Sequence, residues 1–322
     1  MNIIEKIKIN YYQKLFQDFI DRGDYEGFQA AATDLYKSNK SLFSIVPKNF
    51  LKNLLIDSNS YKFFKKNIIW LNSYQREDLN KINDYLKFYI DDDFKILEFV
   101  DEIYKSINDL NLSKQKKLSF DDFVSFNQLL QFCINQKYID TSIFLNNESA
   151  FFEIPDLKNL FTFTNLTSNF IYVVRNPLDI YADQVNFKNN LGKEEAINNI
   201  VNTNIHFKTY EVDDFEIDQN TQSWNINVKS WTSDNVINTY NGLVVQHSDL
   251  ENNNIDTYAE IIAHLNQAGL NIPLDYDKIK QFFEQIKISN KINYKDFEIS
   301  NQIKKIIERD CKEMMKKFNY LS

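Results

Sequence analysis

The sequence predicts an α/β protein in which a parallel sheet is flanked by helices, with an added helical segment at the N-terminus. Three apolar runs carry this prediction, at 67–74, 170–174 and 242–250, and helix-like sequence separates them. Continuous runs of β-branched and aromatic residues are typical of strands buried on both faces, as in parallel sheets. We expect a helical extension over 1–64 and one α/β domain over 65–322.

The run 170–174 is followed by Arg175, Asn176 and Pro177. Pro177 cannot donate to a strand ladder and disfavours a helical Asn176, so the strand ends here and a helix begins. Open α/β folds bind ligands at the carboxyl ends of their strands, which makes Arg175 a candidate ligand residue. The alternative is an arginine that caps the sheet edge or pairs with a neighbouring carboxylate.

Composition limits the classes of function. The chain has 322 residues, a net charge of −8 and only five glycines, so few phosphate-cradling loops can be built. No basic run stands out, which does not favour nucleic acid or a membrane as a partner. Cys133 and Cys311 are typical of reduced thiols, no ligand set has metal spacing, and no signal or membrane-spanning run is found. We therefore expect a cytoplasmic protein without a metal.

The N-terminal segment 1–64 is expected to be helical. Apolar residues recur near helical spacing at Ile4, Ile7, Tyr11, Leu15 and Ile20. We expect a small helical bundle that packs on the main domain or on another subunit. A structural appendage is the first interpretation, and homo-oligomerisation or docking of a protein partner is the second.

The remaining elements follow in order. The strand at 67–74 leads through a turn into a helix that ends near Ile90, the frame of a phosphate-binding loop. Further expectations are helices over most of 91–141, a strand and a second extended piece over 142–154, a helix at 193–201, a polar surface loop over 207–223, helices at 223–232 and 256–265, and a final helix over 302–321.

The segment 170–180, Phe-Ile-Tyr-Val-Val-Arg-Asn-Pro-Leu-Asp-Ile, resembles the second nucleotide-binding motif of the sulfotransferase family. These enzymes have a P-loop-like fold and move a sulfuryl group from PAPS (3′-phosphoadenosine 5′-phosphosulfate) to a hydroxyl or an amine. The resemblance implies that Arg175 binds the 3′-phosphate. In the family a serine eight residues later assists, and here that position is Asp183.

The first family motif, Trp-Leu-Ala-Ser-Tyr-Pro-Lys-Ser-Gly-Asn-Thr, is matched only in its first half, from Trp70 through Ser73 and Tyr74. Arg76 stands where the family has lysine, and Asn80 where it has threonine. The Ser-Gly pair is replaced by Glu77 and Asp78. Two carboxylates there would face the negative charge of the ligand, and one such pair at 4 Å costs about 4 kcal/mol at an effective dielectric near 20.

The family's catalytic histidine corresponds to Glu148, and its supporting lysine to Asn146. A desolvated carboxylate can serve as a base, so Glu148 is the candidate catalytic residue. The alternative is an ordinary exposed side chain. In the later strand, His247 stands at a family tyrosine position, with a structural histidine as the favoured interpretation. The segment 289–296 lacks the glycines and tryptophan of the family's nucleotide-covering loop.

Three functions compete. The first is a divergent sulfotransferase-like protein with lost or impaired PAPS-dependent transfer, either a pseudoenzyme or a cleft reused for another ligand. The second is an active enzyme that places Arg76 and Arg175 on the phosphates and uses Glu148 as base. The third is an interaction subunit that docks through 1–64. PAPS or PAP is the cofactor that the resemblance implies, and its binding is in doubt.

Overall fold

The structure is a computed structural model of the chain. It describes residues 3–22, 66–90, 94–99, 140–148, 166–188, 192–202, 207–212, 215–220, 222–286 and 298–321, with isolated positions between 24 and 138. The described elements, in chain order, are α1 (Ile3–Asp21), β1 (Ile68–Ser73), η2 (Arg76–Leu79), α5 (Asn80–Tyr89), β2 (Phe94–Glu98), β3 (Ser142–Asn147), β4 (Thr167–Val174), α8 (Pro177–Asp183), η5 (Gln184–Lys188), α9 (Lys193–Val201), β5 (Phe207–Val212), β6 (Phe215–Asn220), α10 (Trp224–Thr232), α11 (Asp234–Tyr240), β7 (Gly242–Gln246), α12 (His247–Glu251), α13 (Ile255–Gln267), α14 (Tyr276–Gln285), α15 (Asn301–Asp310) and α16 (Lys312–Lys317).

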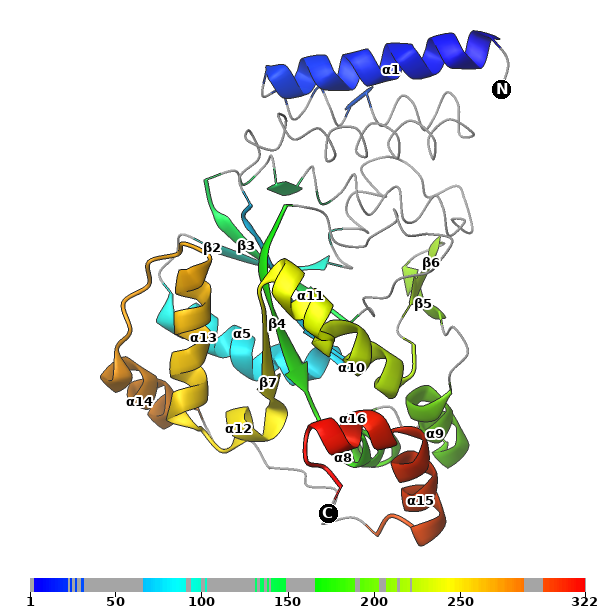
Figure 1. The fold of residues 1–322 in the computed structure, drawn as a ribbon, viewed down its shortest axis with the longest axis vertical. Coiled ribbons are helices and arrows are strands. Elements are labelled where there is room, and N and C mark those ends of the chain that lie inside the picture. Colours follow the sequence, from blue (N-terminus) through cyan, green and yellow to red (C-terminus); the bar gives the residue numbers. More distant parts are fainter. Residues whose placement is uncertain are drawn as a thin grey trace.

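A five-stranded parallel sheet forms the centre of the fold (Figure 1). Its strand order is β2-β3-β1-β4-β7, so β1 and β4 lie side by side in the interior. Their register places Trp70 beside Phe170 and Leu71 beside Ile171. The predicted α/β class, with a parallel sheet flanked by helices, is confirmed.

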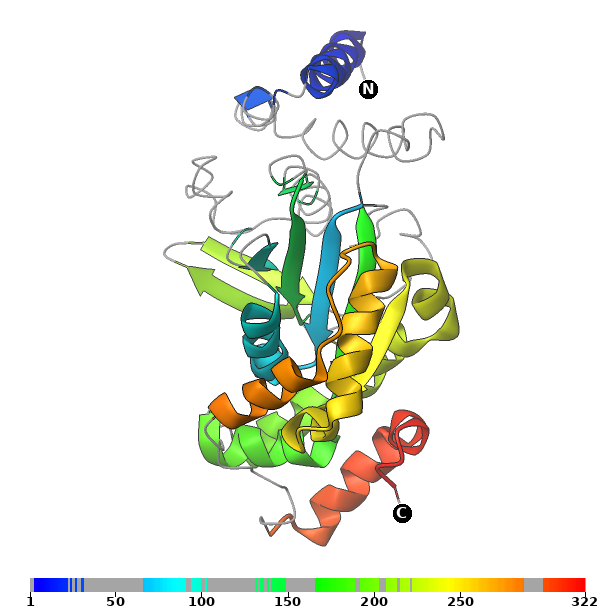
Figure 2. The same ribbon diagram turned by 90° about the vertical axis from the view of Figure 1, so that its left-hand side faces the viewer.

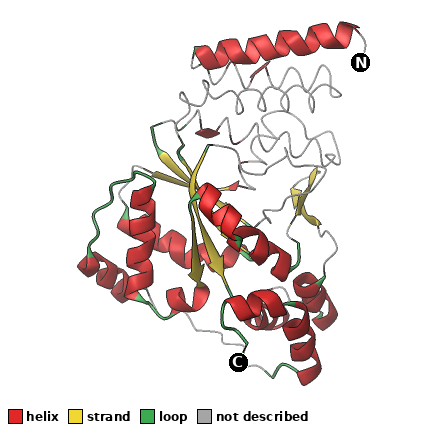
Figure 3. Cartoon of the chain, viewed as in Figure 1, coloured by secondary structure: helices red, strands yellow, loops and turns green. Residues whose placement is uncertain are grey.

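Alternate side chains of the central strands enter two separate cores, one on each face of the sheet. Trp70, Phe170 and Tyr172 belong to the core under α8, α9, α10, α11, α15 and α16. Ile69, Ile171 and Val173 belong to the core under α5, α12, α13 and α14. Because both faces of β1 and β4 are covered, their central stretches 68–71 and 170–174 are continuously apolar, as the sequence predicted (Figures 2 and 3).

The strand-to-helix junction after β4 also follows the prediction. Asn176 caps α8, since its side-chain oxygen accepts a hydrogen bond from the backbone N–H of Leu178 at 3.0 Å. Pro177 occupies the first turn of the helix, where its missing N–H leaves no partner unsatisfied. This junction fixes where the chain leaves the sheet and therefore where Arg175 lies.

Four predictions about elements were wrong. The edge strand β2 lies within the expected helical stretch 91–141, and β5 and β6 form an antiparallel hairpin in place of a loop over 207–223. The strand expected over 242–250 ends at Gln246, and α12 follows it. The expected final helix is divided at Cys311 into α15 and α16. The edge strand β2 is only half-buried and the hairpin mixes apolar with polar residues, so neither has a long apolar run to reveal it.

Part of the N-terminal prediction is tested by α1. Residues 3–21 of this segment are helical, but Ile4, Ile7 and Tyr11 are exposed, and Ile9, Tyr12 and Phe16 are buried. The sequence offers two apolar stripes, and the apolar spacing identified the outer one. The expected elements over 32–64, 103–130, 149–154 and 289–296 lie outside the described residues, and the boundary between the two expected parts stays a prediction.

Gly242 offers a test of how closely β7 packs on β4. A Cβ at Gly242 would lie 2.1 Å from Cζ of Phe170, whose buried ring packs edge-on against Trp231 with centroids 5.0 Å apart. We expect Gly242→Ala to lower the free energy of unfolding by about 1–3 kcal/mol through overpacking, as measured by urea denaturation.

Gly192→Ala is the matched control, because nothing lies within 4 Å of a Cβ at Gly192. A smaller ring neighbour should relieve the strain, so Gly242→Ala combined with Phe170→Leu should cost less than the sum of the two single changes. Equal effects of the two glycine substitutions would contradict this account.

Candidate functional site

The turn between β1 and α5 is the expected phosphate-binding frame, and its side chains divide between two environments. Ser73 is buried, and its hydroxyl donates to the backbone carbonyl of Gln75. Arg76, Glu77 and Asn80 are exposed, whereas Asp78 points inward and is 2% exposed. The turn therefore sends one carboxylate, and neither its arginine nor its asparagine, into the interior.

Arg175 follows the last residue of β4 and is bound by two aspartates. Its Nη1 lies 3.1 Å from Oδ1 of Asp78 and 2.5 Å from Oδ2 of Asp183 at the end of α8. The three side chains are 8%, 2% and 6% exposed. The open alternative for Arg175, a neighbouring carboxylate, is thus the contact that is observed. With His247, these residues form what we call the Arg175 cluster.

The backbone on either side of Arg175 is fixed by buried side chains of other elements. Trp224 Nε1 donates to the carbonyl of Arg175 at 3.0 Å, and the Tyr320 hydroxyl donates to the carbonyl of Val174 at 3.2 Å. The Tyr172 hydroxyl donates to Oδ1 of Asn227 at 2.9 Å. These contacts join α10 and the C-terminal segment to the sheet edge, so the arginine stands on rigid elements.

One guanidinium serves two carboxylates in the cluster, so the charges do not balance. Oδ2 of Asp78 and Oδ1 of Asp183 are buried and have no hydrogen-bond partner among the described residues. Burial raises the pKa of Asp78 to about 6, with Arg175 opposing the rise. For Arg175 itself, burial lowers the pKa, but the two aspartates outweigh it and raise the pKa, so its charge is secure.

His247 extends the cluster toward the surface. Its Nε2 lies 4.0 Å from Oδ1 of Asp78 and 3.9 Å from Oε1 of Glu251, and Lys81 lies 3.8 Å from the same Glu251 oxygen. Burial, and next the charge of Arg175, lower the pKa of His247 to about 4. The imidazole is therefore neutral near pH 7 and adds no positive charge to the site.

The second expected phosphate-binding arginine, Arg76, has a carboxylate partner of its own. Its Nε lies 3.1 Å from Oε2 of Glu98 on β2, and the other oxygen of Glu98 accepts from Nδ2 of Asn146 at 2.8 Å. No ion pair among the described residues joins Arg76 to the Arg175 cluster. The two arginines are thus held by two separate sets of carboxylates.

Glu148 follows β3 directly and is 7% exposed, so the interpretation as an ordinary exposed side chain is wrong. Its backbone carbonyl accepts from Nδ2 of Asn227 at 3.2 Å, which ties it to the same α10 residue that bonds Tyr172. Its catalytic role stays a prediction. His264 is structural, since its ring nitrogen bonds the Phe170 carbonyl at 3.1 Å.

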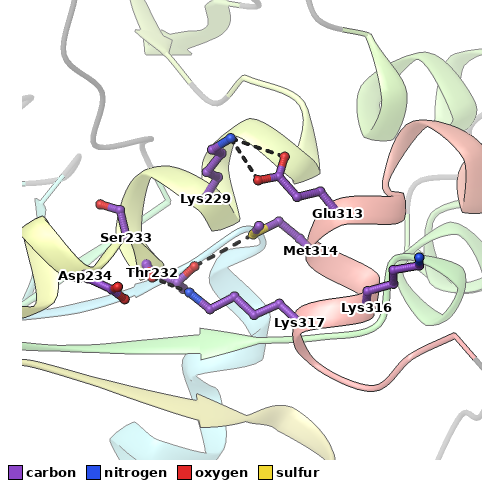
Figure 4. A pocket seen from close by; sticks show the side chains of 8 residues that line it. All are labelled: Lys229, Thr232, Ser233, Asp234, Glu313, Met314, Lys316 and Lys317. Atoms are coloured by element: carbon purple, nitrogen blue, oxygen red, sulfur yellow. Dashed lines mark hydrogen bonds and ion pairs between the residues drawn. The ribbon is translucent and has the colours of Figure 1, made fainter.

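Two further observations concern metal ligands and a surface pocket. Within the described part of the chain, no group of three or more His, Cys, Asp and Glu side chains is arranged to hold a metal. A surface pocket of about 590 Å³ lies between α10, α11 and α16 (Figure 4). None of the residues of the Arg175 cluster lines it. Lys229 pairs with Glu313 at 2.9 Å and Lys317 donates to the Thr232 carbonyl at 2.5 Å, so its walls are bonded to each other.

The sequence analysis did not predict that Asp78 and Asp183 both contact Arg175. The signal was available, because a carboxylate stands at two of the positions where the resemblance expects a phosphate-binding residue or a glycine. Two carboxylates at positions that the resemblance places beside Arg175 predict that the arginine is paired within the chain.

The fold and the site define an α/β protein whose parallel sheet carries a closed ion cluster at its carboxyl edge. No family model and no curated protein matches the chain. Among solved structures, the chain is similar to mouse sulfotransferase SULT7A1 complexed with PAP, at 12% identity and a TM-score of 0.47, over 82% of this chain and 91% of that one.

The opposite pKa shifts of Asp78 and His247 generate a testable pH dependence. Asp78 has a folded-state pKa of about 6, above ~3.9 for the unfolded chain, so its contribution to stability is complete below pH ~4 and is lost as pH rises through 6. His247 has a folded-state pKa of about 4, below ~6.5, so its contribution is complete above pH ~6.5 and is lost as pH falls through 4.

The two contributions oppose each other between about pH 4 and 6, and single variants separate them. Relative to wild type, Asp78→Asn should gain stability as pH rises through this range, whereas His247→Gln should lose it. Urea denaturation at several pH values measures both differences. Two differences of the same sign would show that these groups do not titrate as described.

Substitution of Arg175 separates a structural role from a ligand-binding role. Arg175→Ala leaves two buried carboxylates without their cation, and we expect the free energy of unfolding to fall by roughly 3–5 kcal/mol. Combining it with Asp78→Asn and Asp183→Asn should restore much of this loss. Arg76→Ala is the matched control, since that arginine is half-exposed, and it should cost less than about 1 kcal/mol. An Arg175→Ala variant as stable as wild type would mean that Arg175 is free to serve a ligand.

Proposed function

We propose that this chain is a sulfotransferase-like protein in which PAPS-dependent sulfuryl transfer is lost or strongly impaired, so that it acts as a pseudoenzyme or uses its cleft for another ligand. The Arg175 cluster is the observation that supports the proposal. Asp78 stands at a glycine position of the first motif, and Asp183 stands at the serine position of the second. These two departures supply the two carboxylates that bind Arg175.

The cluster opposes a phosphate in two ways. Both carboxylates contact Nη1 of the guanidinium that would bind the 3′-phosphate, so its positive charge is already matched within the chain. A carboxylate left near the phosphate would cost about 4 kcal/mol at 4 Å, which is roughly a thousandfold in affinity. The residues at this site therefore do not fit PAPS or PAP, and we derive no transfer step through that cofactor.

The second candidate is an active PAPS-dependent transferase. Its specific support is the burial of Glu148 directly after β3, since a carboxylate held at the carboxyl edge of the sheet is a residue type that can accept a proton from a hydroxyl. This candidate requires Arg175 to release Asp78 and Asp183, and Arg76 to release Glu98. A role as an interaction subunit, or a homo-oligomer formed through 1–64, is a third proposal.

Calorimetric titration with PAP, the desulfated nucleotide, tests the first proposal. We expect no measurable binding to wild type. In Asp78→Gly combined with Asp183→Ser, Arg175 loses both carboxylate partners, and we expect affinity for PAP to rise at least a hundredfold, since each removed charge is worth up to about a thousandfold. Adding Arg175→Ala to this variant should abolish the gain.

The matched control is Glu77→Ser, which removes one exposed carboxylate from the same turn without touching Arg175, and it should not create binding. Micromolar binding of PAP to wild type that Arg175→Ala abolishes, while the fold remains stable, would overturn the proposal and favour the active enzyme.

A further inference from the structure

Helix α1 carries two apolar faces, and only one of them packs on the protein. Ile9, Tyr12 and Phe16 are buried at 7%, 7% and 0% exposure. The other face consists of four side chains that we call the outer stripe, exposed at 76%, 67%, 63% and 59%: Ile3, Ile4, Ile7 and Tyr11. At 3.6 residues per turn, the two sets lie on nearly opposite sides of the helix.

The helix lies at one end of the molecule in two perpendicular views (Figures 1 and 2), and the side chains of the outer stripe are exposed. Isolated exposed apolar residues are ordinary, but four on one side of one helix form a continuous patch. None of the described helices combines the length and the apolar character that a membrane crossing needs. A continuous exposed apolar patch is typical of a site that contacts a partner or a membrane surface.

The charges around the outer stripe are mostly positive. Within residues 3–14 there are three exposed lysines, Lys6, Lys8 and Lys14, against one acidic residue, Glu5, which is half-buried. Farther along, Asp18 pairs with Arg22, and Asp21 is the last residue of the helix, away from the stripe. An apolar stripe bracketed by lysines is the pattern of a helix that binds an anionic surface.

A second copy of the chain fits the stripe poorly. Two α1 helices paired antiparallel about Ile7 would place Lys6 beside the partner's Lys6, and Lys8 beside the partner's Lys8. A parallel pair would likewise bring lysines together. Like charges at close range are destabilising, so the charges favour an anionic partner over self-association.

We propose that α1 lies flat on an anionic lipid surface, with the outer stripe at the boundary between headgroups and acyl chains and the lysines at the level of the phosphates. The apolar side chains supply burial, and the lysines supply attraction to anionic headgroups. The net charge of −8 does not oppose this contact, because charges farther than about 8 Å are screened at physiological ionic strength. The proposal is independent of the state of the Arg175 cluster.

Co-sedimentation of the full chain with lipid vesicles tests the proposal. Wild type should bind vesicles of phosphatidylcholine with roughly one-third phosphatidylserine, and should not bind phosphatidylcholine alone. Ile4→Asp combined with Ile7→Asp should abolish binding. Lys6→Gln combined with Lys8→Gln should weaken it about 25-fold, since each lysine near the surface contributes about fivefold.

The matched control is Leu274→Asp combined with Tyr276→Asp, which makes the same change at exposed apolar residues outside α1, and it should bind like wild type. Far-UV circular dichroism and urea denaturation should show that all variants remain folded. Binding that is equal on both lipid compositions, or that survives the Ile4 and Ile7 changes, would overturn the proposal. So would a dimer by sedimentation velocity that Ile7→Asp converts to monomer.

Discussion

The contact of one buried guanidinium with two buried carboxylates is the constraint on which the candidate site depends. A buried charge must be paired, since an isolated one costs several kcal/mol, and here the pairing is made within the chain. Asp78 comes from the turn after β1 and Asp183 from the end of α8, so the cluster also ties β1, β4 and α8 together. The same contact that stabilises this edge of the sheet occupies the cation that a phosphate would need.

The imbalance of the cluster shapes its chemistry. Two aspartates share one arginine, and the histidine beside them is neutral, so the site carries an excess of negative charge that protonation of Asp78 relieves near pH 6. Arg76 is likewise paired with an acidic residue of the chain, Glu98 at the end of β2. Both positive charges that the resemblance assigns to phosphates are thus matched by internal acids.

The sequence predicted the fold where burial on both faces leaves a continuous apolar run, as in β1 and β4. It did not predict β2 or the end of β7, because an edge strand is only half-covered and its pattern is weak. In α1 the helical spacing of apolar residues was detected. The helix carries two apolar stripes, however, and spacing alone cannot show which of them packs against the protein. The candidate residues were named one by one from the sequence, whereas the contact between Asp78 and Arg175 joins residues 97 apart in the chain and requires the tertiary structure.

The hydrogen bond from Tyr320 to the carbonyl of Val174 joins the last described turn of the chain to the residue before Arg175. This end of the protein is thereby a ready point for a spectroscopic label. A fluorophore carried at position 321 would sit next to the sheet edge and report on opening or closing of the ion cluster, while a bulky purification tag is better attached away from this end.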